Sequence, residues 1–98
     1  MKSKLPMPAL TERLSDQSWA YFDSLDEAGK ERVKELVHYV RKYPGVDDVR
    51  IHPAVIDGKS FHVLVEADYT IYFRPEGKTA WIDLIQVTKP EVRKLAYA

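Results

Sequence analysis

The chain contains no cysteine, carries no net charge and has no long apolar run. Without cysteine there can be no disulfide framework, no thiolate nucleophile and no cysteine-based zinc site. Fifteen Lys and Arg balance fifteen Asp and Glu, so only a local patch could attract nucleic acid. No segment approaches the ~20 apolar residues of a membrane-spanning helix, and the first residues lack the apolar run of a signal peptide. These absences predict a cytoplasmic protein with no membrane contact.

The length of 98 residues predicts one domain, residues 1–98, because the chain is too short for two independent cores. Hydrophobic residues make up 45% of the chain and charged residues 31%. This composition is typical of a modest core under a well-solvated surface.

Two helices are expected in the first half of the chain. The first should cover about Thr11 to Asp23, and its expected buried residues are Leu14, Trp19 and Phe22. The second should begin at a capping box formed by Ser24 and Glu27. Its apolar residues recur at helical spacing until the Tyr-Pro-Gly at residues 43–45, and they are Val33, Leu36, Val37, Val40 and Tyr43.

From residue 46 onward, short β-rich runs alternate with turn residues. Asp57-Gly58 predicts a two-residue hairpin, and Pro75-Glu76-Gly77 fits a type I turn closed by a glycine with positive φ. Pro53 cannot donate to a central ladder, so its strand should be an edge strand. The expected fold is α+β, with two N-terminal helices packed on an antiparallel β-meander of three to four strands.

The length of the connection around Glu66, Ala67 and Asp68 decides which residues share a face of the sheet. A two-residue loop mixes Thr70 and Tyr72 with the valines, whereas a three-residue loop gives one almost wholly apolar face. We therefore expect the longer loop. The packed face would then carry Phe61, Val63, Val65, Tyr69, Ile71, Phe73, Trp81, Ile85 and Val87.

The opposite face would combine an apolar floor with several polar groups. Its expected members are His62, Leu64, Thr70, Tyr72, Arg74, Ala80, Ile82, Leu84 and Gln86. An antiparallel sheet often exposes one face to water, so these polar residues are either simple surface residues or a binding site. A protein partner would gain from the Tyr72 and Arg74 anchors, and Leu64 and Gln86 would extend such a partner-binding surface.

The order of these elements, with "FHVLVEADYTIYF", a turn, "AWIDLIQV" and a closing "TKPEVRKLAYA", resembles the RelE/ParE superfamily of bacterial toxins, and most closely its RelE side. The resemblance covers roughly residues 20 to 97. It implies a small α+β fold and an antitoxin-like protein partner. In ribosome-dependent members it also implies metal-free and cofactor-free cleavage of mRNA on the ribosome, with basic side chains stabilising the transition state.

The resemblance implies catalytic roles for several residues of this chain. His62 stands at the first active-strand lysine of the family, and histidine can carry charge or shuttle a proton near neutral pH. Lys89 matches the lysine after the last strand, and Tyr97 lies within one residue of the terminal tyrosine. Arg74 and Arg93 are further candidates for phosphate contacts. The candidate catalytic set is therefore His62, Arg74, Lys89, Arg93 and Tyr97.

Three positions depart from the family pattern. Leu64 replaces the second lysine, while Thr70 and Pro90 stand where the arginines that clamp the phosphate are expected. Since lysine lacks the paired geometry of arginine, the sequence predicts a weak or attenuated mRNA endonuclease at most. Thr70→Arg should then raise its activity.

Two further interpretations remain open. The chain could instead be a non-catalytic relative that binds an antitoxin or a topoisomerase-like target through its sheet face. A histidine metal site built from His38, His52 and His62 is a weaker hypothesis, because the spacings match no ligand pattern. The tail of the chain distinguishes the two main hypotheses. A ribonuclease site requires Lys89, Arg93 and Tyr97 to lie close to His62 and Arg74, whereas a binding protein does not.

Overall fold

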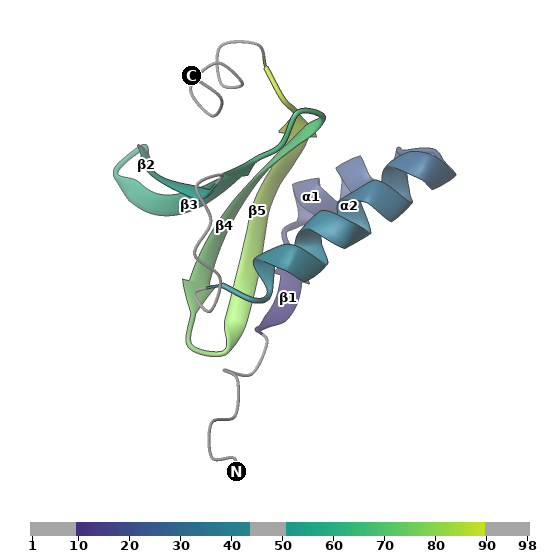
Figure 1. Ribbon diagram of the computed structural model, residues 1–98. Helices are drawn as coiled ribbons and strands as arrows, with labels where there is room; N and C mark the ends of the chain where they lie inside the picture. Colours follow the sequence, from purple (N-terminus) through teal and green to yellow (C-terminus); the bar gives the residue numbers. More distant parts are fainter. Residues whose placement is uncertain (1–9, 44–50, 90–98) are drawn as a thin grey trace.

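The computed structural model describes residues 10–43 and 51–89 of the chain. In chain order its elements are β1 (Thr11–Leu14), α1 (Asp16–Asp23), α2 (Glu27–Val40), β2 (Ile51–Ile56), β3 (Lys59–Val65), β4 (Tyr69–Glu76) and β5 (Thr79–Val87). The two helices lie on one side of the sheet, and the β2–β3 hairpin curls away from them (Figure 1). The fold is thus α+β with two helices, as the sequence predicts.

The sheet is larger than the sequence predicts, and it is mixed. Its five strands follow the order β1-β5-β4-β3-β2. Strands β2 to β5 pair antiparallel with their neighbours in sequence, whereas β1 pairs parallel with β5. The predicted antiparallel meander of three to four strands therefore does not include β1, which makes the sheet five-stranded and mixed.

The segment Thr11–Leu14 is a strand and not the first turn of a helix. Its partners Thr79–Ile82 are far away in the sequence, so no local pattern in four residues could indicate the pairing. Helix α1 begins only after Ser15, whose hydroxyl accepts a hydrogen bond from the Ser18 N–H at 3.1 Å. The expected burial also fails at Trp19, which is 51% exposed.

Helix α2 begins two residues later than the predicted capping box. Its N-cap is Asp26, whose carboxylate accepts a hydrogen bond from the Gly29 N–H at 2.9 Å. Ser24 instead terminates α1, where its hydroxyl donates to the Tyr21 carbonyl. Four residues of the predicted apolar stripe are confirmed as buried residues of α2, namely Val33, Leu36, Val37 and Val40. The fifth, Tyr43, lies beyond the end of α2 and is only partly buried.

Both predicted turns occur, one of them shifted. Asp57 and Gly58 have φ of 51° and 79°, as a type I′ hairpin turn requires. The second turn consists of Gly77 and Lys78, with Gly77 at φ 59°, while Pro75 and Glu76 belong to β4. Pro53 lies in β2, which is an edge strand as predicted.

The connection from β3 to β4 has two residues rather than the predicted three. Val65 pairs with Thr70, and the Glu66 N–H donates to the Tyr69 carbonyl at 3.0 Å. Only Ala67 and Asp68 remain in the turn. Because side chains alternate between faces, this change reverses the predicted face of every residue in β3 relative to β4.

Two residues from other elements hold this turn. Arg32 of α2 donates to Asp68 at 2.8 Å and to Glu66 at 3.1 Å. The hydrogen bond to Asp68 raises the pKa of Arg32. Thr88 donates its backbone N–H to the Asp68 carbonyl and its hydroxyl to the Glu66 carbonyl. The turn is therefore fixed from α2 and from the end of β5.

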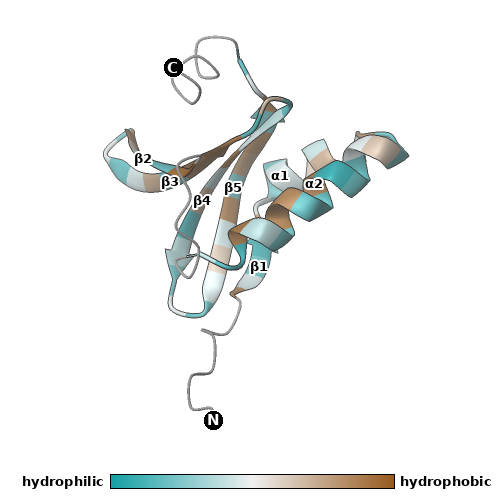
Figure 2. Cartoon of the chain, in the orientation of Figure 1, coloured by the Kyte–Doolittle hydropathy of each residue, from teal (hydrophilic) through white to brown (hydrophobic). Residues whose placement is uncertain are grey.

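The core lies between the helices and one face of the sheet. On that face six side chains are at most 1% exposed, namely Leu64, Ile71, Phe73, Ala80, Ile82 and Ile85. A β-bulge in β5, between the pairs Tyr72–Leu84 and Phe73–Ile82, keeps this apolar row continuous. Hydrophobic and hydrophilic bands alternate along β4 and β5 (Figure 2).

No helix in the described part of the chain is long and apolar enough to cross a membrane.

Candidate functional site

The candidate catalytic residues do not lie on one face of the sheet. His62 pairs with Phe73 on the helix-facing side, and its ring centroid lies 4.7 Å from that of Tyr43 and 5.6 Å from that of Phe73. Arg74 follows Phe73 and points to the opposite side, which we call the outer face. The shared face predicted for His62 and Arg74 is therefore wrong.

Arg74 is tied to two carboxylates. Its guanidinium donates to Asp83 at 2.8 and 3.1 Å and to Glu76 at 2.9 Å. The hydrogen bonds to Asp83 raise the pKa of Arg74 against the opposing effect of partial burial. Asp83 is the extra residue of the bulge in β5, so the irregularity of the strand brings this carboxylate to Arg74. A phosphate would have to displace both carboxylates to use this guanidinium.

Of the other catalytic candidates, the structure describes only Lys89. Lys89 is exposed just beyond β5, and Arg93 and Tyr97 lie outside the described residues. Among the partner-binding candidates, Leu64 is fully buried in the core, which corrects its predicted place on a binding face. Tyr72 and Gln86 do share the outer face, where the Gln86 amide lies 3.4 Å from the Tyr72 hydroxyl.

Thr70 occupies a closed position on the outer face. Its side chain is fully buried, and its hydroxyl lies 2.8 Å from that of Thr88. Thr88 in turn donates to the Glu66 carbonyl. A position of this kind has no room for an arginine that reaches a phosphate, so the expectation that Thr70→Arg restores activity loses its structural basis.

Aromatic and basic side chains form a row across the outer face. The Arg74 guanidinium lies 5.9 Å from the Phe61 ring centroid, and that of Arg13 lies 5.4 Å from the Trp81 ring centroid. Phe61 and Trp81 are half-buried here instead of packing against the helices as expected. Val63 is buried on this same face, next to Tyr72.

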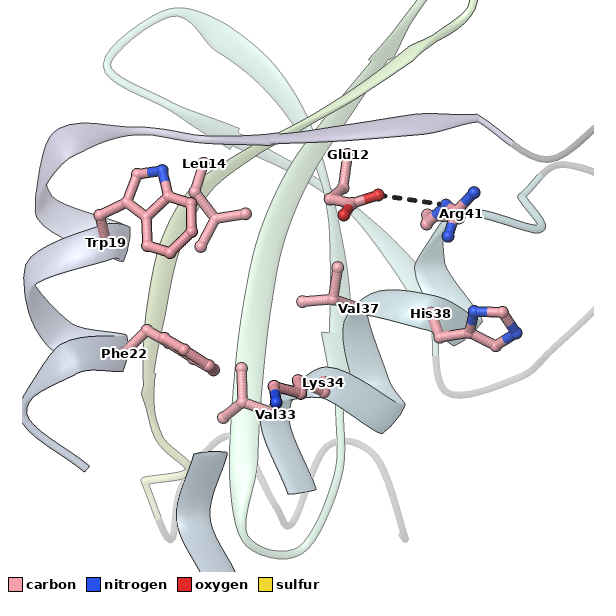
Figure 3. Close-up of a pocket in the computed structure, with 9 residues that line it drawn as sticks. All are labelled: Glu12, Leu14, Trp19, Phe22, Val33, Lys34, Val37, His38 and Arg41. Carbon is pink, nitrogen blue, oxygen red and sulfur yellow. Dashed lines mark ion pairs between the residues drawn. The ribbon is translucent and has the colours of Figure 1, made fainter. Parts of the chain in front are cut away.

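A groove lies on the other side of the sheet, between β1, α1 and α2. It encloses about 330 Å³. Figure 3 shows Leu14 of β1, Trp19 and Phe22 of α1, and Val33 and Val37 of α2 around it. The Trp19 and Phe22 rings meet edge to face with centroids 6.0 Å apart. We call this feature the helix groove.

The rim of the helix groove is polar and contains several cations. Arg41 pairs with Glu12 at 3.3 Å (Figure 3). The Arg41 Nε also donates to the Leu10 carbonyl at 2.7 Å. Lys34 and His38 complete the rim. An apolar floor with a few polar groups around it is the usual composition of a binding site.

Sequence reasoning missed the helix groove because it placed Leu14 and Trp19 in one buried helical stripe. No signal in the sequence marks Trp19 as a surface residue, because only the packing of β1, α1 and α2 leaves it 51% exposed beside Leu14 and Phe22. No cluster of three or more potential metal ligands occurs within residues 10–43 and 51–89. Neither the protein-family models nor the curated proteins gave a match to this chain.

Proposed function

We propose that this protein is a non-catalytic binding domain of the RelE/ParE type, which engages an antitoxin-like protein through the helix groove. The observation that carries the proposal is the separation of the ribonuclease candidates. His62 packs between Tyr43 and Phe73 beside the helices, whereas Arg74 lies on the outer face with its charge held by Asp83 and Glu76. General acid–base and electrostatic catalysis both require their groups around one reacting phosphate.

The helix groove supports the binding half of the proposal. Exposed tryptophan in an apolar recess with a charged rim is typical of residues that dominate protein–protein affinity. Trp19 has this environment, because Leu14 and Phe22 line the same recess. The outer face is the alternative surface for a partner, through Tyr72 and Gln86.

The test of binding uses the protein encoded by the neighbouring gene, since the resemblance implies an antitoxin there. Calorimetry should give a defined affinity for the unmodified chain and a loss of about tenfold or more for Trp19→Ala. Tyr72→Ala is the matched control on the outer face and should bind almost normally. If Tyr72→Ala weakened binding while Trp19→Ala did not, the partner site would lie on the outer face.

The test of catalysis uses purified ribosomes that carry a defined mRNA. Primer extension should detect no A-site cleavage by the unmodified protein beyond that of a buffer control. Cleavage that disappears in Lys89→Ala would overturn the non-catalytic half of the proposal, because it would require a working site that includes the residue after β5.

A further inference from the structure

Trp19 is the largest of the exposed apolar side chains in the described part of the chain, at 51% exposure. The helix groove opens directly beside it, and Leu14, Val33 and Val37 are among the lining residues. Figure 3 shows Trp19 and Phe22 on the α1 side of the groove and Val37 on its α2 side. One surface patch therefore contains a protruding aromatic side chain and, next to it, an apolar recess that could receive such a side chain.

A patch with these two features is complementary to itself. In a dimer with two-fold symmetry, both copies contribute the same patch to the interface, and each contact occurs twice. When Trp19 of one copy enters the helix groove of the other, the reverse contact forms at the same time. Tryptophan held in such a recess is among the residues that dominate the affinity of protein interfaces.

The charges of the two helices fit the same arrangement. Helix α1 contains Asp16 and Asp23 and neither lysine nor arginine. On α2, Lys30, Lys34 and His38 follow one another at intervals of four residues, so they share one stripe of the helix. Lys34 and His38 of this stripe line the groove. In a two-fold pair with α1 of one copy along α2 of the other, the acidic helix would face the basic stripe.

Contacts within the chain leave most of these charges available. Lys34 pairs with Glu31 at 3.4 Å, but the two side chains are 62% and 70% exposed, so this ion pair contributes little. The Lys30 ammonium lies 6.0 Å from the Phe22 ring centroid, close to α1. Arg41 adds no net charge to the rim, because Glu12 neutralises it.

We infer that two copies of this chain associate through the helix groove, with Trp19 of each copy in the groove of the other and α1 along the opposite α2. The chain carries no net charge, so two copies do not repel each other at long range. The pair closes the surface that the proposed function assigns to an antitoxin-like protein, and that protein must therefore separate the two copies. The dimer is independent of the proposed function, whereas this competition rests on it.

Sedimentation equilibrium over a range of protein concentrations tests the dimer. The unmodified chain should show a monomer–dimer equilibrium. Trp19→Ala removes two anchors at once, so it should weaken dimerisation about 100-fold if each anchor contributes about tenfold. Val55→Ala is the matched control, because Val55 is 72% exposed on β2, at the opposite edge of the sheet from β1. A monomer at every concentration, or a dimer that Trp19→Ala does not weaken, would overturn the inference.

Two double variants test how the helices face each other. Asp16→Lys with Asp23→Lys makes α1 basic, and Lys30→Glu with Lys34→Glu makes the stripe of α2 acidic. Each variant alone should be monomeric, because α1 and α2 then carry charge of the same sign.

Mixing the two variants in equal amounts should produce a mixed dimer, since both of its contacts join opposite charges. A folding defect in either variant would not be repaired by mixing, and circular dichroism of each variant checks for one. Two folded variants that stay monomeric when mixed would overturn the α1–α2 arrangement.

Titration of the dimer with the protein encoded by the neighbouring gene tests the competition. The expected result is a complex with one copy of this chain, which appears as the dimer disappears. A complex in which two copies remain joined through Trp19 would overturn the competition. Absence of any binding would overturn the proposed function and the competition together, while the dimer would still be decided by sedimentation.

Discussion

The two faces of the sheet differ sharply although they are built from the same strands. Toward the helices, Ile71 and Phe73 of β4 are fully buried. One residue along the same strand, Thr70, Tyr72 and Arg74 point to the outer face and satisfy their polar groups with hydrogen bonds. The face that packs against the helices is therefore the one whose apolar side chains contact α2 without interruption. This arrangement buries the polar side chain of Thr70 on the outer face.

The largest effect is expected from Thr70→Arg. The site is fully buried and its hydrogen-bonding capacity is used by Thr88, so a guanidinium there would be a buried, uncompensated charge. We expect a loss of about 3–5 kcal/mol in the free energy of unfolding, measured by urea denaturation. The control is Thr70→Val, which keeps the shape and should cost about 1 kcal/mol. A stable Thr70→Arg variant would show that the outer face is open at this position.

The two faces can be compared directly with neighbouring substitutions in β4. Ile71→Ala should cost about 2–5 kcal/mol, because it leaves a cavity between the sheet and α2. Tyr72→Ala, on the half-buried outer face, should cost clearly less in the same denaturation experiment. Equal losses would mean that both faces are packed cores.

A smaller effect is expected at the bulge. Asp83→Ala removes the carboxylate that binds Arg74 through two hydrogen bonds. Both side chains are partly exposed, at 32% and 25%, so we expect a loss of about 1 kcal/mol. Glu31→Ala is the matched control, because its ion pair with Lys34 is highly exposed and should contribute little. Thermal unfolding of the two variants side by side tests whether the outer-face pair has a structural role.

The smallest effect is expected at Asp68 in the β3–β4 turn, whose length determines which residues of the two strands share a face. Burial alone would raise the pKa of Asp68, but hydrogen bonds from Arg32 and the backbone outweigh it, and the pKa lies below the ordinary 3.8. The carboxylate therefore stabilises the fold above about pH 4, and this contribution is lost as the pH falls through the lowered pKa. Asp68 is 45% exposed, so Asp68→Asn should cost only about 0.5 kcal/mol at pH 7.

The pH dependence is the decisive measurement for this turn. The difference in the free energy of unfolding between Asp68→Asn and the unmodified chain should shrink toward zero as the pH falls through the lowered pKa of Asp68. Arg32 remains charged throughout this range because arginine loses its proton only at strongly basic pH. A difference that stays constant from pH 7 to pH 3 would show that the carboxylate charge does not stabilise the turn.

Local patterns in the sequence determined several elements. The apolar stripe of α2 follows from helical spacing, the Asp57-Gly58 turn from its need for positive φ, and the edge position of β2 from Pro53. Each of these rests on residues close together in the chain. The α+β class and the strand-rich second half follow from the same kind of signal.

Only the tertiary structure decided which residues meet. The parallel pairing of β1 with β5 joins segments at opposite ends of the described chain, and four residues carry no periodicity that could predict it. The β3–β4 register depends on Arg32 from α2 and Thr88 after β5, which satisfy polar groups that a strand pattern would expose. His62 and Arg74 consequently lie on opposite faces, and the helix groove opens beside an edge strand, because distant contacts outweighed the apolar alternation of the individual strands.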